Sequence, residues 1–142
     1  MLCALFALIA CYITYPQGDI NWGISHDKEK LFSSSIENEE QNNLSVKISD
    51  FKSGKNFTIT YWAANSDKKA EWKRTIGLYT SADKELYRKD SDVVKVPDQL
   101  IKKMLQENKT IKVYTWSLPK DPKEAARVRI RRVHLCTIML KQ

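Results

Sequence analysis

The sequence predicts a mainly β protein, an antiparallel β-sandwich of about seven short strands and one small helix, with a partly open barrel as the alternative. Three observations support this fold class. Several short segments alternate apolar with polar residues, β-branched and aromatic residues concentrate in these segments, and only one segment has convincing helical spacing. The 142 residues fit a single domain that is large enough to bury a core.

The first clear strands lie in the first half of the chain. Leu44, Val46 and Ile48 alternate with polar residues, which is the pattern of a half-buried strand. A turn follows around Gly54, a residue free to adopt a positive φ, and the segment 57–62 then carries β-branched and aromatic residues on both faces. We therefore expect an antiparallel pair of strands joined by a short turn.

The other segments before residue 110 are expected to form connections, strands and one helix. The largely polar segment 26–43 is expected to be a solvated connection. Strands are expected at 75–80 and within 86–96. A helix is expected over 97–108, with Pro97 at its first position. Its apolar stripe, which we expect to pack on a sheet, consists of Leu100, Ile101, Met104 and Leu105.

The C-terminal third contains the pair of strands around which the sheets are expected to form. The runs 111–118 and 128–140 are rich in apolar residues, and the segment between them contains Pro119 and Pro122. These runs predict a β-hairpin with a long connection, which supplies a central strand and its partner. In the second run, arginines alternate with apolar residues until Arg132 interrupts the alternation, which predicts a β-bulge at that point.

The first fourteen residues carry no charge and are strongly apolar. This run is shorter than the roughly 20 apolar residues that cross a bilayer, so we expect no stable membrane span. Its length and composition are typical of the apolar part of a secretory signal, which predicts export and a single mature domain over 15–142. The run up to Cys11 also resembles a lipoprotein box, in which this cysteine is lipidated. A first strand within the fold of a cytosolic protein is the remaining alternative.

Three Asn-X-Ser/Thr acceptors favour an exported glycoprotein. They begin at Asn43, Asn56 and Asn108, and each falls near an expected strand edge or turn, where an oligosaccharide is tolerated. Removal of the first fourteen residues would leave Cys136 as the only cysteine, so no internal disulfide framework is expected. We therefore expect an extracellular or cell-surface protein, with a lipid-anchored envelope protein as the alternative.

The composition is basic, with 24 lysines and arginines, 17 acidic residues and a net charge of +7. This charge permits a polyanion, either a glycan or a nucleic acid, as the partner, whereas a basic surface without a dedicated partner is the simpler interpretation. Trp72, Tyr114 and Trp116 could add a stacking surface, although Trp116 suits a sandwich core equally well. The candidate anion site consists of Lys73, Arg74, Arg127, Arg129, Arg131 and Arg132.

Signals for catalysis or metal binding are weak. His26 and His134 are far apart and the cysteines have no paired spacing, which argues against a common zinc site. No phosphate-binding glycine loop, nucleophile elbow or dinucleotide motif is present, so no cofactor is expected. His134 and Cys136 lie on one face of a strand and are the candidate pair for nucleophilic catalysis, although a structural role is favoured. The spacing of a calcium loop is also missing from three nearby aspartates, Asp83, Asp90 and Asp92.

Three segments, Gly54–Trp62, Ile76–Tyr79 and Tyr114–Pro119, resemble the Ig-like modules of secreted and cell-wall proteins. In the Ser/Thr-rich, GPI-anchored surface proteins related to fungal glucan assembly, a glycine likewise precedes a strand that ends in tryptophan. A short apolar strand and an aromatic segment follow. The resemblance covers about residues 51–130 and implies an extracellular Ig-like module. This chain departs from the family at the charged segment 68–74, and no functional residue is carried over.

The sequence therefore predicts an exported or cell-surface binding or structural module without catalytic activity, whose ligand is an unknown protein or glycan. The alternative function is a basic polyanion-binding module that uses the arginine-rich strand. A small hydrolase centred on His134 and Cys136 is the third hypothesis.

Overall fold

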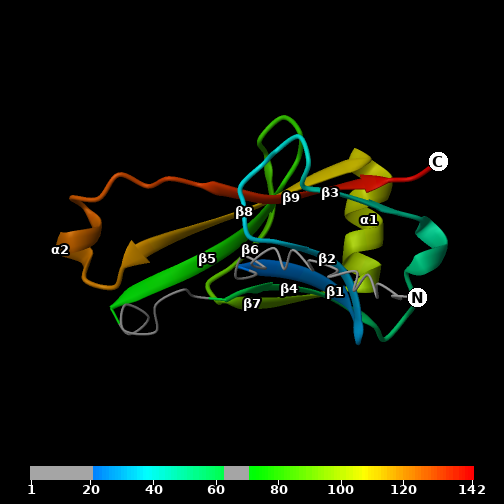
Figure 1. Cartoon of the computed structure of the whole chain (residues 1–142), viewed down its shortest axis with the longest axis horizontal. Coiled ribbons are helices and arrows are strands. Elements are labelled where there is room, and N and C mark those ends of the chain that lie inside the picture. Colours follow the sequence, from blue (N-terminus) through cyan, green and yellow to red (C-terminus); the bar gives the residue numbers. More distant parts are fainter. Residues whose placement is uncertain (1–20, 63–70) are drawn as a thin grey trace, which may run out of the picture.

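The computed structural model describes residues 21–62 and 71–142, and it contains two packed β-sheets with a helix at one end (Figure 1). The four-stranded sheet has the order β2-β1-β4-β7 and contains β1 (Trp22–His26), β2 (Glu29–Ser34), β4 (Asn56–Tyr61) and β7 (Val93–Pro97). The five-stranded sheet has the order β3-β9-β8-β5-β6 and contains β3 (Asn43–Val46), β5 (Trp72–Tyr79), β6 (Glu85–Lys89), β8 (Thr110–Pro119) and β9 (Val133–Leu140). A mainly β, sandwich-like architecture is thus confirmed, while its Ig-like character stays a prediction.

The strand that we expected to form a hairpin with β4 belongs to the other sheet. β3 runs parallel to β9, which makes the five-stranded sheet mixed, whereas the four-stranded sheet is antiparallel throughout. Between β3 and β4 the chain crosses sheets through a 3-10 helix, η1 (Ile48–Asp50), and a turn in which Gly54 has the expected positive φ of 82°. The predicted pair was wrong because an alternating pattern determines which face of a strand is buried and not which strand it pairs with.

The polar segment 26–43 is not simply a connection, because it contains β2. Among the described strands it lies at the edge of the four-stranded sheet and pairs only with β1. An edge strand is stabilised by one ladder of backbone hydrogen bonds and needs few apolar side chains. Leu31 and Phe32 supply that contact and are partly buried against the core. Two adjacent apolar residues in an otherwise polar segment do not predict a strand, so β2 was missed.

The helix α1 (Asp98–Asn108) confirms the predicted helix and crosses one end of the sandwich (Figure 1). Pro97 occupies the N-cap, one position before the expected one, and its φ of −56° suits a helix start. Leu100, an expected member of the apolar stripe, is exposed. The buried stripe consists of Ile101, Met104 and Leu105.

The two C-terminal strands form the central pair of the five-stranded sheet, as predicted. β9 begins at Val133, however, and the arginines before it belong to the connection, which also contains the short helix α2 (Pro122–Ala125). Asp121 caps this helix by accepting a hydrogen bond from the backbone N–H of Lys123. The irregularity in the ladder lies between Val113 and Tyr114 of β8, opposite residue 135, and not at Arg132. A bulge inside β9 therefore replaces the one predicted from the arginine pattern.

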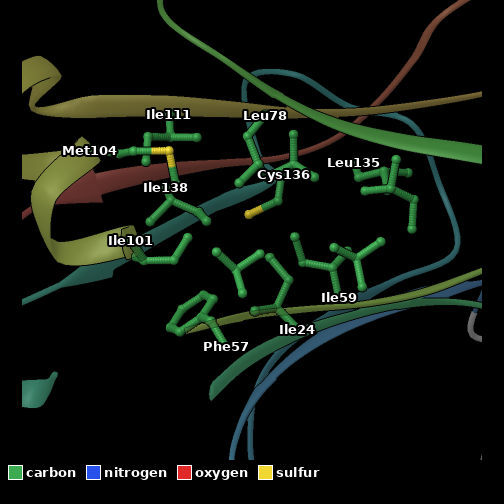
Figure 2. Packing of buried hydrophobic residues seen from close by; sticks show 14 of the residues in the cluster. Ile24, Phe57, Ile59, Leu78, Ile101, Met104, Ile111, Leu135, Cys136 and Ile138 are labelled. Atoms are coloured by element: carbon green, nitrogen blue, oxygen red, sulfur yellow. The ribbon is translucent and has the colours of Figure 1, made fainter. Parts of the chain in front are cut away.

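The core between the sheets consists mainly of aliphatic side chains, with Phe57 and Cys136 among them, and is contributed by both sheets and by α1 (Figure 2). Ile24 and Ile59 come from the four-stranded sheet, and Leu78 and Ile138 come from the five-stranded sheet. All four are at most 1% exposed. Because burial of apolar area is the main favourable contribution to folding, this layer holds the two sheets together.

Among the helices within residues 21–62 and 71–142, none has the length and hydropathy that crossing a membrane requires.

Candidate functional site

One end of the five-stranded sheet extends into a projection that we call the arm. It consists of Trp72–Thr75 of β5, Trp116–Pro119 of β8 and the connection 120–132. β5 and β8 pair up to Trp72 and Pro119, whereas β9 pairs with β8 only as far as Thr115. In Figure 1 the helix α2 marks the tip of the arm, at the opposite end of the molecule from α1.

Arg127 and Arg129 lie on the connection of the arm and are exposed. Within residues 21–62 and 71–142, no hydrogen bond or ion pair joins either guanidinium group to another side chain. Ile130 beside them is 52% exposed. Arg131 is also exposed, but its Nη2 lies 2.7 Å from the carboxylate of Glu37.

Arg132 is held at the start of β9 by two tyrosines and one carboxylate. Its guanidinium carbon lies 4.8 Å from the ring centre of Tyr79 and 4.7 Å from that of Tyr114. Nη2 donates hydrogen bonds of 2.7 and 3.0 Å to the two carboxylate oxygens of Asp83. The hydrogen bond to Asp83 raises the pKa of Arg132. These contacts give the side chain a structural role, because they already satisfy its charge.

Lys73 and Arg74 of β5 are also paired within the fold. Lys73 lies 3.1 Å from Asp90, and Arg74 lies 3.5 Å from Asp92. The guanidinium of Arg74 stacks 3.7 Å above the ring of Tyr61 and therefore joins β5 to the four-stranded sheet. The structure thus does not assemble the six predicted basic residues into a single stripe.

Two of the three aromatic residues considered for the anion site, Trp116 and Tyr114, have internal partners. Trp116 is buried, at 9% exposure, and contacts the ring of Tyr79. Tyr114 packs edge-on against His134. Trp116 is therefore a core residue, as one of the two interpretations of the sequence suggested.

His134 and Cys136 are both buried in β9, on either side of the bulge. Burial raises the pKa of the Cys136 thiol to about 12, so this thiol is almost entirely protonated near neutral pH. Burial also lowers the pKa of His134, whose Nε2 lies 2.8 Å from Oγ1 of Thr137. This environment does not activate a cysteine nucleophile, which requires a lowered thiol pKa.

The three aspartates considered for calcium each face a basic side chain instead. Asp83 contacts Arg132, and the neighbouring carboxylates contact Lys73 and Arg74. Within the part of the chain that the structure describes, no group of three or more His, Cys, Asp or Glu side chains could hold a metal ion.

The three predicted glycosylation sites differ in accessibility. Asn43, at the start of β3, is exposed, whereas Asn56 and Asn108 are partly buried. Nδ2 of Asn108 donates a hydrogen bond of 2.9 Å to the carbonyl of Met104, and Nδ2 of Asn43 donates one of 2.5 Å to the carbonyl of Glu40. A glycan on either nitrogen would disturb that bond. Cys11, the predicted lipidation site, lies outside the described residues.

The structure adds a histidine–aspartate pair that the sequence analysis missed. Nε2 of His26 on β1 lies 2.6 Å from Oδ2 of Asp98, whose side chain is fully buried at the start of α1. The backbone N–H of Lys52 donates to the same oxygen at 2.8 Å, and the N–H of Asp98 donates to the carbonyl of Lys55 at 3.0 Å. Oδ1 of Asp98 is buried without a hydrogen-bond partner in the described residues.

A cavity of about 380 Å³ opens beside this pair. Its walls come from β1, β2, β3, η1, β4 and the turn before β4. The polar lining includes His26, Lys52 and Lys55, and the apolar lining includes Phe51 and Phe57. The two members of the pair are 72 residues apart in the chain, so no local motif could have revealed them. The only hint is a carboxylate at the first position of the helix, which is also an ordinary helix-start residue.

Comparisons with protein-family models, with curated proteins and with solved structures found no match to this chain.

Substitution of Asp98 by alanine is expected to lower the free energy of unfolding by about 3 kcal/mol. The substitution leaves the ring of His26 and the backbone N–H of Lys52 without their acceptor. Urea denaturation measures the effect, and Glu107→Ala, an exposed carboxylate on the same helix, is the control with an expected change within about 0.5 kcal/mol. Equal stabilities of the two variants would contradict the structural role of Asp98.

Stability is expected to fall as the pH drops below about 6.5, in part through His134. Its folded-state pKa is lowered from 6.5 by burial, so the unfolded chain binds a proton before the folded chain does. The contribution of His134 to the free energy of unfolding is complete above the pKa that this histidine has in the unfolded chain. Below that pH the contribution declines by up to about 1.4 kcal/mol per pH unit, until the pH reaches the pKa of His134 in the folded chain.

The variant His134→Gln keeps a polar partner for Thr137 and cannot titrate, so it isolates this contribution. The wild-type advantage in the free energy of unfolding is expected to be larger at about pH 7.5 than at about pH 5.5. Chemical denaturation of both proteins at the two pH values provides the measurement. A constant difference between them would show that His134 titrates normally.

Proposed function

We propose that the chain is an exported, non-catalytic binding module that binds polyanions through the arm. The observation that carries this proposal is the state of Arg127 and Arg129. Both side chains are exposed, and neither is neutralised by a carboxylate in the described residues. A guanidinium group that keeps its charge available can replace counterions on a polyanion, which is the main source of affinity for such ligands.

The local charge of the arm supports the same role. Residues 120–131 contain five basic and two acidic residues, a net charge of +3 within a total of +7. One of the acidic residues, Asp121, caps α2. A projecting surface of one charge sign steers a ligand of opposite charge more effectively than charges scattered over a compact body.

A binding role is favoured over catalysis by the state of Cys136, whose buried thiol has a raised pKa of about 12. Export and a cell-surface location are proposed from the uncharged run 1–14 and from the acceptor motif at the exposed Asn43. The Ig-like character is proposed from the resemblance described above, and the packed sheets support it only in general terms. Within this proposal the natural ligand is an acidic glycan, a nucleic acid or an acidic protein surface.

The arm can be tested with heparin and a single-stranded oligothymidylate as probes. The double variant Arg127→Ala/Arg129→Ala is expected to weaken binding of both. For the oligothymidylate, the slope of log affinity against log salt is expected to become shallower by about 1.4, because each phosphate contact contributes about 0.7.

The matched control is Lys95→Ala/Lys103→Ala, which removes the same charge from exposed positions on β7 and α1. This control is expected to keep the wild-type slope. An equal loss of affinity in both double variants would show that binding depends on the net charge of the protein and not on the arm, which would contradict the proposal. Binding that does not depend on salt would refute the proposal.

Export predicts that the mature protein isolated from the cells that make it lacks about the first dozen residues. Intact mass spectrometry of the secreted and cellular fractions gives the answer. Additional hexose mass that is lost in Asn43→Gln would support the glycoprotein, and additional lipid mass would support the lipoprotein alternative. A full-length, unmodified chain in the soluble cell fraction would contradict export.

A further inference from the structure

His26 lines the cavity, and one of its two ring nitrogens has no hydrogen-bond partner in the described residues. Its other nitrogen, Nε2, is held by the buried carboxylate of Asp98, which fixes the orientation of the ring. Nδ1 has no hydrogen-bond partner in the described residues and does not belong to their buried unpaired atoms. The side chain is 14% exposed and lines the cavity. A polar atom in a fixed orientation is therefore available to a ligand there.

The cavity has an apolar side that suits a hydrocarbon group. Phe51 and Phe57 contact the ring of His26, with centroid distances of 6.5 and 5.9 Å. Three aliphatic residues continue this side, namely Leu31, Leu44 and Val46. The volume of about 380 Å³ falls at the small end of the range for ligand pockets, about 300–1,000 Å³.

The charged groups around the cavity leave one lysine available. Lys55 is paired with Asp27 at 3.1 Å. Asp50 accepts a hydrogen bond of 2.9 Å from the backbone N–H of Lys47. The ammonium group of Lys52 has no side-chain partner within the residues described, and the carboxylate of Glu29 lies on the β2 wall of the same cavity.

We propose that this cavity binds a small organic carboxylate with an apolar body. The apolar body lies against Phe51 and Phe57, and the carboxylate lies between Nδ1 of His26 and the ammonium group of Lys52. Nδ1 donates to the carboxylate of the ligand when it carries a proton. The site lies at the α1 end of the molecule and does not depend on the polyanion proposal for the arm.

Phenylacetate is the probe for this site, and the two histidines of the chain are the reporters. Imidazole signals in a ¹H–¹³C correlation spectrum are followed during titration with sodium phenylacetate. The signals of His26 are expected to shift to saturation with a millimolar dissociation constant. The signals of His134, which is buried in β9, are expected to stay in place.

The variant Lys52→Ala removes the ammonium group and keeps the backbone N–H that binds Asp98. Its affinity for phenylacetate is expected to be about tenfold weaker, the loss of one charge-assisted contact. Lys30→Ala is the matched control, because Lys30 is exposed on β2 between two lining residues and does not itself line the cavity. The control and Arg127→Ala/Arg129→Ala are both expected to bind phenylacetate like the wild type.

Two analogues of phenylacetate complete the test, the neutral phenylacetamide and the cationic phenethylamine. Phenylacetamide is expected to bind at least about tenfold more weakly than phenylacetate. Equal binding of phenylacetamide would reduce the site to an apolar pocket and overturn the proposal. Tighter binding of phenethylamine would assign the recognition to Glu29 and overturn it as well, as would His26 signals that do not move or a Lys52→Ala variant that binds normally.

Discussion

The buried carboxylate of Asp98 is the point at which three separate parts of the chain meet. It contacts β1 through His26, the turn before β4 through the N–H of Lys52, and it begins the helix that leads from one sheet to the other. Burying a carboxylate is costly unless partners replace its water. The partners here come from distant segments, so the carboxylate is stable only when the end of the sandwich is assembled. Its position therefore links the closure of the fold to the shape of the adjacent cavity.

The other end of the sandwich is closed by a different interaction. Arg74 stacks on Tyr61, and Tyr61 stacks on Trp22 with a centroid distance of 6.1 Å. This stack joins the two sheets through a guanidinium group whose charge is balanced by Asp92. The strands β5 and β8 continue past it, because they pair with each other and need no cover from the four-stranded sheet. The stack of Arg74, Tyr61 and Trp22 therefore covers this end of the core, while β5 and β8 extend beyond it into the arm.

The sequence predicted the elements whose signals are dense and local. α1 has a helical stripe after a proline, β8 and β9 have long apolar runs, and β5 has a short one. All four were predicted, although β9 begins at Val133 and not at residue 128. The pairing of β3 with β9 and the existence of β2 were missed. Both depend on which strands approach each other across the sandwich, and nothing within a half-buried pattern specifies that. The contact between His26 and Asp98 was missed for the same reason.

The candidate anion site shows how tertiary structure changes the meaning of a charge count. The alternation of arginine and apolar residues before β9 predicts a strand, but it is also the pattern of an extended connection. Four of the six basic residues then meet carboxylates that are distant in the sequence. An arginine that is already paired gains little from a new anion, because it must first give up its partner. The charge that can act on a polyanion is therefore concentrated at Arg127 and Arg129, and the total of +7 is a poor measure of it.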